Sequence, residues 1–257
     1  MSNEAGASNA VSASQNIYDT AEFFQGYIKL DRQVLGLDGA PEWPQLRAML
    51  PNIQESQILD LGCGMGWFAR WAKQQGAAHI LGLDLSQNML DRAVELTNMD
   101  NIEYQRADLN QLNLAPGKYD LVFSSLAFHY LVNLKGLFAE IQQALKPGGK
   151  LVFSIEHPIF TGPTRGGIIS DAEGRLIWPL DAYHREGLRH RNWFVDGVEK
   201  QHHTLGTYIN TLFQSGFELT DFVEWCPTED DLKKFPGWEK EFIRPTFLLM
   251  GAIKKCS

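Results

Sequence analysis

The sequence predicts an α/β fold in which helices cover both faces of a doubly wound, mostly parallel seven-stranded sheet. Three observations support this prediction. Short apolar runs alternate with helical segments over residues 57–155, which is the pattern of parallel strands joined by crossover helices. The first run ends in a glycine-rich turn at residues 62–66. Two further β-like runs, 218–225 and 246–254, follow near the C-terminus.

The N-terminal region is predicted to be a polar tail followed by helices. Residues 1–16 are small and polar, and we expect them to be disordered. Residues 18–50 have a helical pattern, which Gly and Pro residues interrupt over 36–44. We therefore divide the chain into a disordered tail, an N-terminal helical cap over 17–51 and a main domain over 52–257.

The main domain is predicted to begin with five strands and the helices between them. The expected strands are the apolar runs 57–61, 79–85, 102–106, 119–124 and 150–155. The expected helices are 67–75, a helix that Ser86 caps, and the amphipathic segment 133–145. The Lys-Pro-Gly-Gly sequence at 146–149 is predicted to end the last of these helices.

The segment after the fifth strand has a different composition. Residues 156–203 are rich in Gly, Pro, His and Trp and have little periodicity. Because long loops inside compact domains are usually functional, we predict a lid insertion over 157–203. A helix over 204–216 is then expected to lead to the last two strands, which can pair antiparallel around residues 227–245.

Composition restricts the partners and the compartment. The net charge of −8 argues against a general binder of nucleic acid or of anionic membranes, which need basic surfaces. Three cysteines, a low and odd number, favour a reducing compartment. No apolar run approaches the roughly 20 residues that cross a bilayer, and the N-terminus lacks the apolar segment of a signal peptide. We therefore expect a cytoplasmic protein with no nucleic-acid or membrane partner.

The glycine turn and two acids indicate a ligand site. Glycines at this turn let a ligand lie against the backbone, although a purely structural strand-to-helix turn also uses them. Asp84 ends the second strand, where an acid can bind ribose hydroxyls. Asp108 follows the third strand and could accept from an adenine amino group. Each acid alone could be a capping or turn residue, but together they favour an adenosine-containing ligand.

The spacing of the glycines distinguishes two classes of adenosine ligand. Pyrophosphate sites use the pattern GxGxxG, and the third glycine here comes one position earlier. Asp60 would also repel a pyrophosphate, whereas it suits an ammonium group. This combination favours a ligand with a methionine moiety over NAD.

Five segments, in order, resemble motifs of the class I S-adenosylmethionine-dependent methyltransferases, in particular the type 11, ubiquinone/menaquinone-biosynthesis-like group. These are ILDLGCGMG (58–66), GLDLS (82–86), RADL (106–109), YDLVFSSLAFHYL (119–131) and LKPGGKLVFS (145–154). The resemblance covers about residues 54–156. It implies a Rossmann-like methyltransferase fold with S-adenosylmethionine as cofactor.

The resemblance also implies roles for individual residues. The backbone at Gly62 and Gly64 is expected to contact the methionine part, Asp84 the ribose, and Asp108 with the Leu109 amide the adenine. The full set of expected cofactor-binding residues is Asp60, Gly62, Cys63, Gly64, Asp84, Leu85, Met89, Asp108, Leu109 and Ser124. Arg32 is a candidate partner of the methionine carboxylate, with a solvated helix arginine as the alternative.

Methyl transfer needs alignment above all, and a base only when the acceptor must lose a proton. His129 and His157 follow the fourth and fifth strands and are the candidate catalytic residues; a structural histidine is the alternative for each. Candidate acceptor contacts, which could instead be packing residues, are Tyr18, Tyr27, Tyr130, Trp178 and His203. No metal site is predicted.

The sequence therefore predicts an enzyme that transfers a methyl group from S-adenosylmethionine to O, N or C of a small-molecule acceptor, as a monomer or homodimer. Two alternatives remain open. One is an NAD-dependent oxidoreductase, and the other is a non-catalytic S-adenosylmethionine-binding protein.

Overall fold

The computed structural model describes residues 14–255, which form one large sheet with two small hairpins beside it. The strand order is β10-β11-β5-β4-β1-β2-β3. Neighbouring strands from β1 to β5 pair parallel, and β11 pairs antiparallel with both β5 and β10. The predicted fold and the antiparallel terminal pair are thus confirmed. The strands are β1 (Gln57–Leu61), β2 (His79–Asp84), β3 (Ile102–Arg106), β4 (Tyr119–Ser125), β5 (Leu145–Glu156), β10 (Phe217–Glu224) and β11 (Phe247–Lys254).

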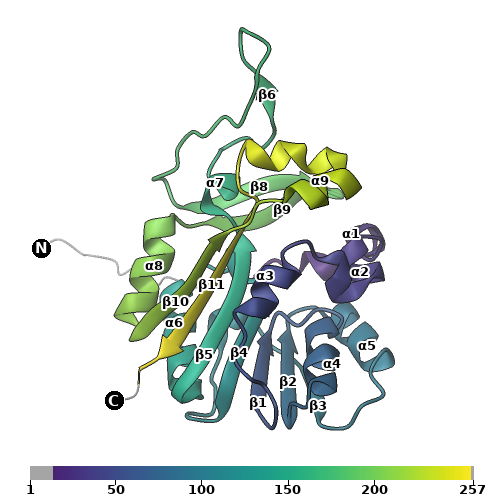
Figure 1. Cartoon of the computed structure of the whole chain (residues 1–257), viewed down its shortest axis with the longest axis vertical. Helices are drawn as coiled ribbons and strands as arrows, with labels where there is room; N and C mark the ends of the chain where they lie inside the picture. Colours follow the sequence, from purple (N-terminus) through teal and green to yellow (C-terminus); the bar gives the residue numbers. More distant parts are fainter. Residues whose placement is uncertain (1–13, 256–257) are drawn as a thin grey trace, which may run out of the picture.

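Helices cover the sheet on both faces (Figure 1). Helices α6 (Leu134–Ala144) and α8 (Leu205–Gln214) share one buried core with Leu59 of β1, whereas α3 (Trp43–Ala48) and α4 (Trp67–Gln74) share the other with the adjacent Ile58. Consecutive strand residues point to opposite faces, so one apolar strand contributes to both cores. Helix α5 (Gln87–Glu95) lies against β2 and β3.

The N-terminal region consists of short helices. They are η1 (Ile17–Asp19), α1 (Ala21–Tyr27), α2 (Asp31–Val34) and η2 (Gly36–Gly39), followed by α3. The disordered tail over residues 1–16 stays a prediction. The structure describes residues 14–16 of it, where Ser14 Oγ donates to Asp108 Oδ2 (2.8 Å) and Gln15 Nε2 donates to the Gly197 carbonyl (3.1 Å). Residues 1–13 lie outside the described part of the chain.

The region after β5 is not one long loop, whereas the lid insertion over 157–203 stays a prediction. This region contains α7 (Pro158–Thr161), a short hairpin of β6 (Ile169–Ser170) and β7 (Leu176–Ile177), and a longer hairpin of β8 (Gly187–Trp193) and β9 (Val195–His202). The buried side chains of β9 alternate along the strand, but they are Val198, Lys200 and His202. Two of the three are polar, so the strand has no period-two apolar pattern.

The strand β5 begins earlier than predicted. The residues 146–149 end α6, as expected, but they also belong to β5. Leu145 pairs with Tyr119 and Lys150 pairs with Leu121, so the register between β4 and β5 shifts over this stretch. A proline and two glycines are tolerated there because an irregular part of a strand needs fewer ladder hydrogen bonds.

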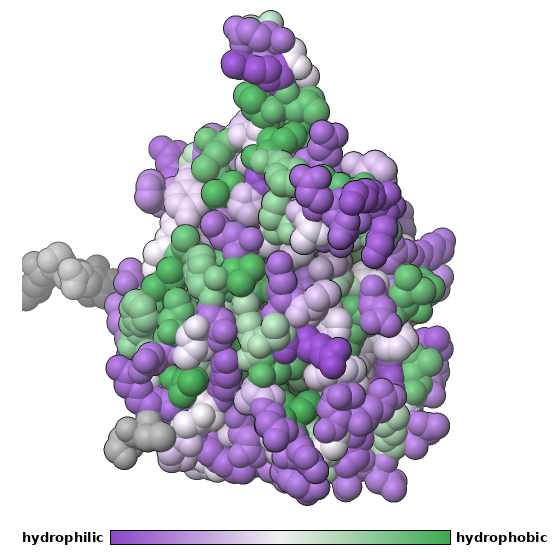
Figure 2. Space-filling model, viewed as in Figure 1, coloured by the Kyte–Doolittle hydropathy of each residue, from purple (hydrophilic) through white to green (hydrophobic). Residues whose placement is uncertain are grey.

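The upper end of the molecule in Figure 1 holds several short elements that follow β5 in the chain. Hairpin β8–β9, α7, α9 (Glu229–Lys234) and η5 (Pro236–Phe242) are found there, at the carboxyl end of β5, and hairpin β6–β7 projects beyond them. Figure 2 shows hydrophobic surface below the hydrophilic tip of this projection, where Ile169, Leu176 and Ile177 are exposed. None of the helices over residues 14–255 has the length and apolar character that crossing a membrane requires.

Candidate functional site

The glycine turn joins β1 to α4. Gly62, Gly64 and Gly66 all have positive φ angles, of 72°, 52° and 73°, which favour glycine. The Gly62 N–H donates to the Leu83 carbonyl (2.7 Å) and ties the turn to the end of β2. A Cβ at Gly62 would lie 2.4 Å from Ala127 Cβ, whereas a Cβ at Gly64 would meet no atom within 4 Å. The backbone at Gly64 therefore faces open space.

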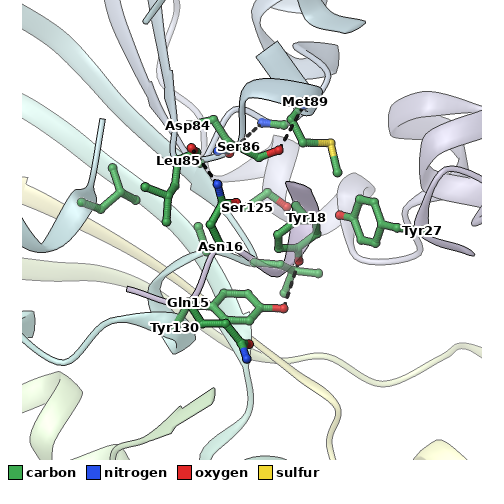
Figure 3. A pocket seen from close by; sticks show the side chains of 15 residues that line it. Gln15, Asn16, Tyr18, Tyr27, Asp84, Leu85, Ser86, Met89, Ser125 and Tyr130 are labelled. Atoms are coloured by element: carbon green, nitrogen blue, oxygen red, sulfur yellow. Dashed lines mark hydrogen bonds between the residues drawn. The ribbon is translucent and has the colours of Figure 1, made fainter. Parts of the chain in front are cut away.

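A pocket, here called pocket A, opens beside this turn at the carboxyl ends of β1, β2 and β4 (Figure 3). Its floor comes from these strand ends and its cover from the N-terminal segment. The lining residues are Gln15, Asn16, Tyr18, Tyr27, Gly62, Gly64, Asp84, Leu85, Ser86, Met89, Leu109, Ser125, Leu126, Ala127 and Tyr130.

Asp84 is the carboxylate of pocket A. Its Oδ2 accepts from the Gly64 N–H (2.8 Å), and its Oδ1 accepts from the Ser86 N–H (2.9 Å). Burial raises the pKa of Asp84 above its ordinary value, although these backbone bonds act against the rise. The carboxyl group is therefore held in a fixed orientation, with acceptor capacity left for hydroxyl groups of a ligand.

A second pocket, pocket B, shares Tyr27, Gly62, Gly64, Ser125 and Leu126 with pocket A and reaches Asp60. The Asp60 side chain is buried, with 2% of its surface exposed, and its Oδ2 has no hydrogen-bond partner within residues 14–255. Burial, with a smaller contribution from Asp84, raises the pKa of Asp60 well above its ordinary value. A buried carboxyl group without a partner is costly, and a cationic ligand group would relieve that cost.

Arg32 also lines pocket B. One of its terminal nitrogens, Nη2, donates to both carboxylate oxygens of Glu42, each at 3.1 Å. The predicted role of Arg32 toward the methionine carboxylate stays a prediction, and the structure adds that Glu42 already balances the charge of this arginine.

The N-terminal segment covers pocket A. The Tyr18 and Tyr130 hydroxyls are 3.0 Å apart and share a hydrogen bond. Asp19 accepts from Ser86 Oγ (2.5 Å) and from the Asn88 N–H (3.1 Å), so it caps the first turn of α5. The pKa of Asp19 is lowered: burial alone would raise it, but the hydrogen bond from Ser86 and the α5 amides outweigh burial.

Most of the predicted cofactor residues meet at these two pockets. Gly62, Gly64, Asp84, Leu85, Met89 and Leu109 line pocket A, and Asp60 and Cys63 line pocket B. Burial raises the pKa of the Cys63 thiol well above its ordinary value, so this cysteine stays a neutral side chain.

Two predicted cofactor residues do not line either pocket. The Asp108 carboxylate is bonded to Ser14 Oγ and to the Asn110 N–H (2.9 Å). Ser124 is fully buried and its Oγ donates to the Leu61 carbonyl (2.7 Å). The neighbouring Ser125 lines both pockets instead.

Several residues that line pocket A were not predicted from the sequence. Ser125, Leu126 and Ala127 line pocket A, and their position directly at the end of β4 is the signal that could have found them. Gln15 and Asn16 lie in a stretch of small polar residues that looks disordered, so the sequence carries no signal for them.

The two candidate catalytic histidines lie outside these pockets. His129 is buried, and its Nδ1 accepts from the Glu156 N–H (3.3 Å). Burial lowers the pKa of His129 to about 4, so its imidazole is neutral at pH 7. His157 caps α7 by accepting from the Ile159 N–H (3.0 Å), and its other ring nitrogen contacts Glu224 (2.9 Å).

The candidate acceptor residues divide into two groups. Tyr18, Tyr27 and Tyr130 line pocket A. Trp178 lines a different cavity and donates through its indole nitrogen to the Ile159 carbonyl (2.8 Å). The His203 ring donates to the Leu131 carbonyl (2.9 Å) and lines neither pocket A nor pocket B.

Comparison with known proteins identifies the family. Residues 59–153 match the family model described as a methyltransferase domain. The crystal structure of an S-adenosylmethionine-dependent methyltransferase from Mesorhizobium loti has a TM-score of 0.82 and 50% sequence identity, and the match covers 85% of this chain and 100% of that one. This chain belongs to the class I S-adenosylmethionine-dependent methyltransferases.

Two other relatives of the methyltransferase support this family assignment. A putative S-adenosylmethionine-dependent methyltransferase from Listeria monocytogenes has a TM-score of 0.77 and 36% identity, over 84% of this chain and 99% of that one. The malonyl-[acyl-carrier protein] O-methyltransferase of Hamiltonella defensa is 36% identical over 110 residues, which are 43% of this chain and 42% of that protein.

The residues of the methyltransferase pockets suit its cofactor, S-adenosylmethionine. The unpartnered Asp60 Oδ2 has the acceptor capacity that an ammonium group requires, and the open space at Gly64 lets a ligand approach the backbone. Within residues 14–255, no group of three or more His, Cys, Asp or Glu side chains is arranged to hold a metal ion.

Proposed function

We propose that the methyltransferase transfers a methyl group from S-adenosylmethionine to an O, N or C atom of a small-molecule acceptor, with pockets A and B as the donor site. The observation that supports a small acceptor is the covered pocket A, where residues from Gln15 to Tyr27 lie over the strand ends. A covered pocket suits a small molecule better than a polymer. The partial match to the Hamiltonella defensa enzyme covers 43% of this chain, so its acceptor is not carried over.

The donor residues act by binding and orientation. Bound S-adenosylmethionine supplies a methyl group already activated by its sulfonium. We assign Asp60 to the ammonium of the methionine part, the backbone at Gly62 and Gly64 to its chain, and Asp84 to the ribose hydroxyls. Met89 and Leu109 provide apolar surface for the adenosine. Fixed orientation of this kind is the main source of rate in a transfer that needs alignment.

The acceptor side is proposed to be the hydrogen-bonded pair of Tyr18 and Tyr130. Burial raises the pKa of both hydroxyls, so both stay protonated and can donate to an acceptor atom. His129 is proposed as a positioning residue, because its Nδ1 accepts from the backbone at the end of β5 and its ring does not line pocket A. His157 is proposed to hold α7 in place through its helix cap.

Tyr130→Phe is expected to lower kcat/KM for the acceptor by about three- to tenfold, because one hydrogen bond contributes roughly 0.5–1.5 kcal/mol. The affinity for S-adenosylhomocysteine should stay unchanged. Tyr119→Phe is the control for packing, since Tyr119 is more deeply buried than the partly buried Tyr130 and begins β4, at the opposite end of the strand. Equal loss of activity in both variants would assign the effect to packing.

Asp60→Asn is expected to change the pH dependence of S-adenosylhomocysteine binding. The raised pKa of Asp60 means that the empty site keeps its proton to higher pH than an ordinary acid. The wild-type affinity should therefore rise with pH as the carboxylate forms, and Asp60→Asn should be about tenfold weaker at pH 8 with a smaller rise. Calorimetric titrations from pH 5 to 8 measure both quantities.

The pKa of Asp84 is raised as well, so its ionisation also makes the affinity for S-adenosylhomocysteine rise with pH. The comparison between wild type and Asp60→Asn, rather than the wild-type profile alone, is therefore the test. Superimposable pH profiles for the two proteins would remove Asp60 from ammonium binding.

Transfer of a labelled methyl group tests the proposed acceptor class. The enzyme is incubated with methyl-labelled S-adenosylmethionine and a cell extract that has been separated into metabolites, RNA and protein. We expect label in the metabolite fraction, where mass spectrometry identifies the product. Label confined to RNA or protein would overturn the small-molecule assignment.

A further inference from the structure

A third hollow, here called the cationic cavity, lies between α7, hairpin β8–β9 and η5. Its volume is about 640 Å³. Glu156 is the one Asp or Glu among its described lining residues, although the whole chain has a net charge of −8. Its basic lining residues are Arg165, Arg191, Lys200, Lys240 and Arg244. Positive charge is therefore concentrated in this cavity, although the net charge of the chain is negative.

Two of these cations have carboxylate partners and three do not. Lys200 pairs with Glu156, and Arg244 pairs with Glu241. Within residues 14–255, no carboxylate oxygen lies within 4.0 Å of the charged nitrogens of the other three cations, which are Arg165, Arg191 and Lys240. The cavity thus has an excess of positive charge that its own side chains do not balance.

Arg191 is the half-buried member of this unbalanced set. Its terminal nitrogens donate to backbone carbonyls, at 2.9 Å to Thr161, 2.6 Å to Pro163 and 3.0 Å to His190. These bonds hold the guanidinium in one place, and the carboxylates that act on its charge, Glu156 and Asp181, lie beyond ion-pair distance. Burial lowers the pKa of Arg191, which shows the cost of keeping this charge partly away from water. An anion bound in the cavity would offset that cost.

The other two unbalanced cations, Arg165 and Lys240, are exposed at the rim. Both side chains can reach toward an anion without losing a hydrogen bond, because neither has a hydrogen-bonded side-chain partner in the described part of the chain. Long basic side chains at the mouth of a cavity raise the local concentration of an anionic ligand.

Aromatic rings form the remaining wall and fix the cations. The Arg244 guanidinium lies 4.8 Å from the centre of the Phe160 ring and 5.2 Å from that of Trp178, and these two rings stack at 5.5 Å. Lys200 Nζ lies 5.0 Å from the centre of the Trp193 ring. Cations held over aromatic faces are rigid as well as charged, so the cavity can bind an anion without much reordering of its wall.

One layer of side chains separates this cavity from pocket A. Lys200 Nζ lies 5.9 Å from the ring centre of Tyr130, which lines pocket A. Trp193, which lines the cavity, lies edge-on to Tyr27 of pocket A at 5.8 Å. A group in the cavity is therefore one side chain away from the Tyr18–Tyr130 pair.

We propose that the cationic cavity binds an anionic group of the methyl acceptor, a carboxylate or a phosphate, among Arg165, Arg191 and Lys240. The atom that receives the methyl group then lies at the Tyr18–Tyr130 pair in pocket A. This inference rests on the proposed function, since it names the chemical class of that same acceptor.

The first test separates the metabolite fraction on a strong anion-exchange resin before incubation with methyl-labelled S-adenosylmethionine. We expect the label in products of the retained fraction. Label only in products of the flow-through would overturn the anionic acceptor and leave the proposed function intact, whereas no label in any fraction would overturn both. Alkaline phosphatase removes the phosphate of a phosphate-bearing acceptor, and amidation with a carbodiimide and an amine neutralises a carboxylate. We expect one of these treatments to prevent labelling of the product. An acceptor that survives both treatments would contradict the proposal.

The second test uses the double variant Arg165→Gln/Lys240→Gln, in which both positions are exposed and the fold should be unaffected. We expect the KM for the acceptor fraction to rise about tenfold, with kcat and the affinity for S-adenosylhomocysteine unchanged. The matched control is Arg175→Gln/Lys233→Gln, two exposed basic residues outside the cavity. An unchanged KM in the first variant, or the same rise in the control, would overturn the assignment.

Discussion

Replacing Asp84 with Asn is expected to weaken binding of S-adenosylhomocysteine by about ten- to hundredfold. The carboxylate is the group that we assign to the ribose hydroxyls, and hydrogen bonds to a charged group contribute roughly 1.5–3 kcal/mol. Its two oxygens are held by the Gly64 and Ser86 amides, at 2.8 and 2.9 Å. Asn keeps the size of the side chain, so the loss should reflect charge and acceptor capacity. Isothermal titration calorimetry measures it.

The same substitution should not destabilise the empty protein. The pKa of Asp84 is raised in the folded state, so folding stability falls as the pH rises from its unfolded to its folded pKa. Asn removes the charge that burial disfavours, but its NH2 group replaces one of the two oxygens that accept from the Gly64 and Ser86 N–H groups. Because these two effects oppose each other, we expect the thermal stability at pH 7 to change little. Asp120→Asn is the control for the binding measurement. It removes an ion pair with Lys146 near the start of β4 and should leave the affinity for S-adenosylhomocysteine unchanged. Unweakened binding by Asp84→Asn would exclude Asp84 from the site.

Gly62→Ala is expected to destabilise the fold by about 2–4 kcal/mol, which would lower Tm by roughly 5–15 °C. Two effects add. The φ of 72° is unfavourable for alanine, and the new Cβ would lie 2.4 Å from Ala127 Cβ. Because Ala127 lines pocket A, its displacement should also weaken ligand binding. Calorimetric melting of the empty protein measures the loss of stability.

Gly64→Ala separates stability from binding. Its φ of 52° carries the same kind of backbone cost, but the new Cβ would meet no atom within 4 Å. We therefore expect a loss of only about 1–2 kcal/mol in stability, together with a tenfold or greater loss of affinity, since the methyl group enters the space that both pockets share. A larger loss of stability for Gly64→Ala than for Gly62→Ala would contradict this account of the turn.

The sheet could be predicted because its signals are local. Each parallel strand is an apolar run such as residues 57–61, and the glycines and Asp84 fall at strand ends, where topology brings them together. The hairpin β8–β9 could not be predicted, because Lys200 and His202 occupy buried positions of β9. Their burial depends on partners distant in sequence, such as Glu156 for Lys200 and Thr161 for His202.

The donor half of the site could be predicted better than the acceptor half. Asp60, Gly64 and Asp84 lie within one compact set of strand ends, so their order in the sequence implies their proximity. The cover of pocket A comes from residues 15–27, which contact the start of α5 and the segment that follows β4. Tyr18 and Tyr130, for example, are 112 residues apart in the sequence. Such long-range contacts leave no local pattern.

The central claim is that the protein binds S-adenosylmethionine in the pocket beside the glycine turn and transfers its methyl group to a small acceptor. The most direct measurement compares S-adenosylhomocysteine formed with labelled product formed, for wild type and Asp84→Asn, in the presence of the metabolite fraction. For wild type, we predict equal amounts of the two products. For Asp84→Asn, we predict about ten- to hundredfold less of both products, when the donor concentration lies below the weakened Kd of the variant. Undiminished transfer by Asp84→Asn, or labelled product without an equal amount of S-adenosylhomocysteine, would contradict the claim.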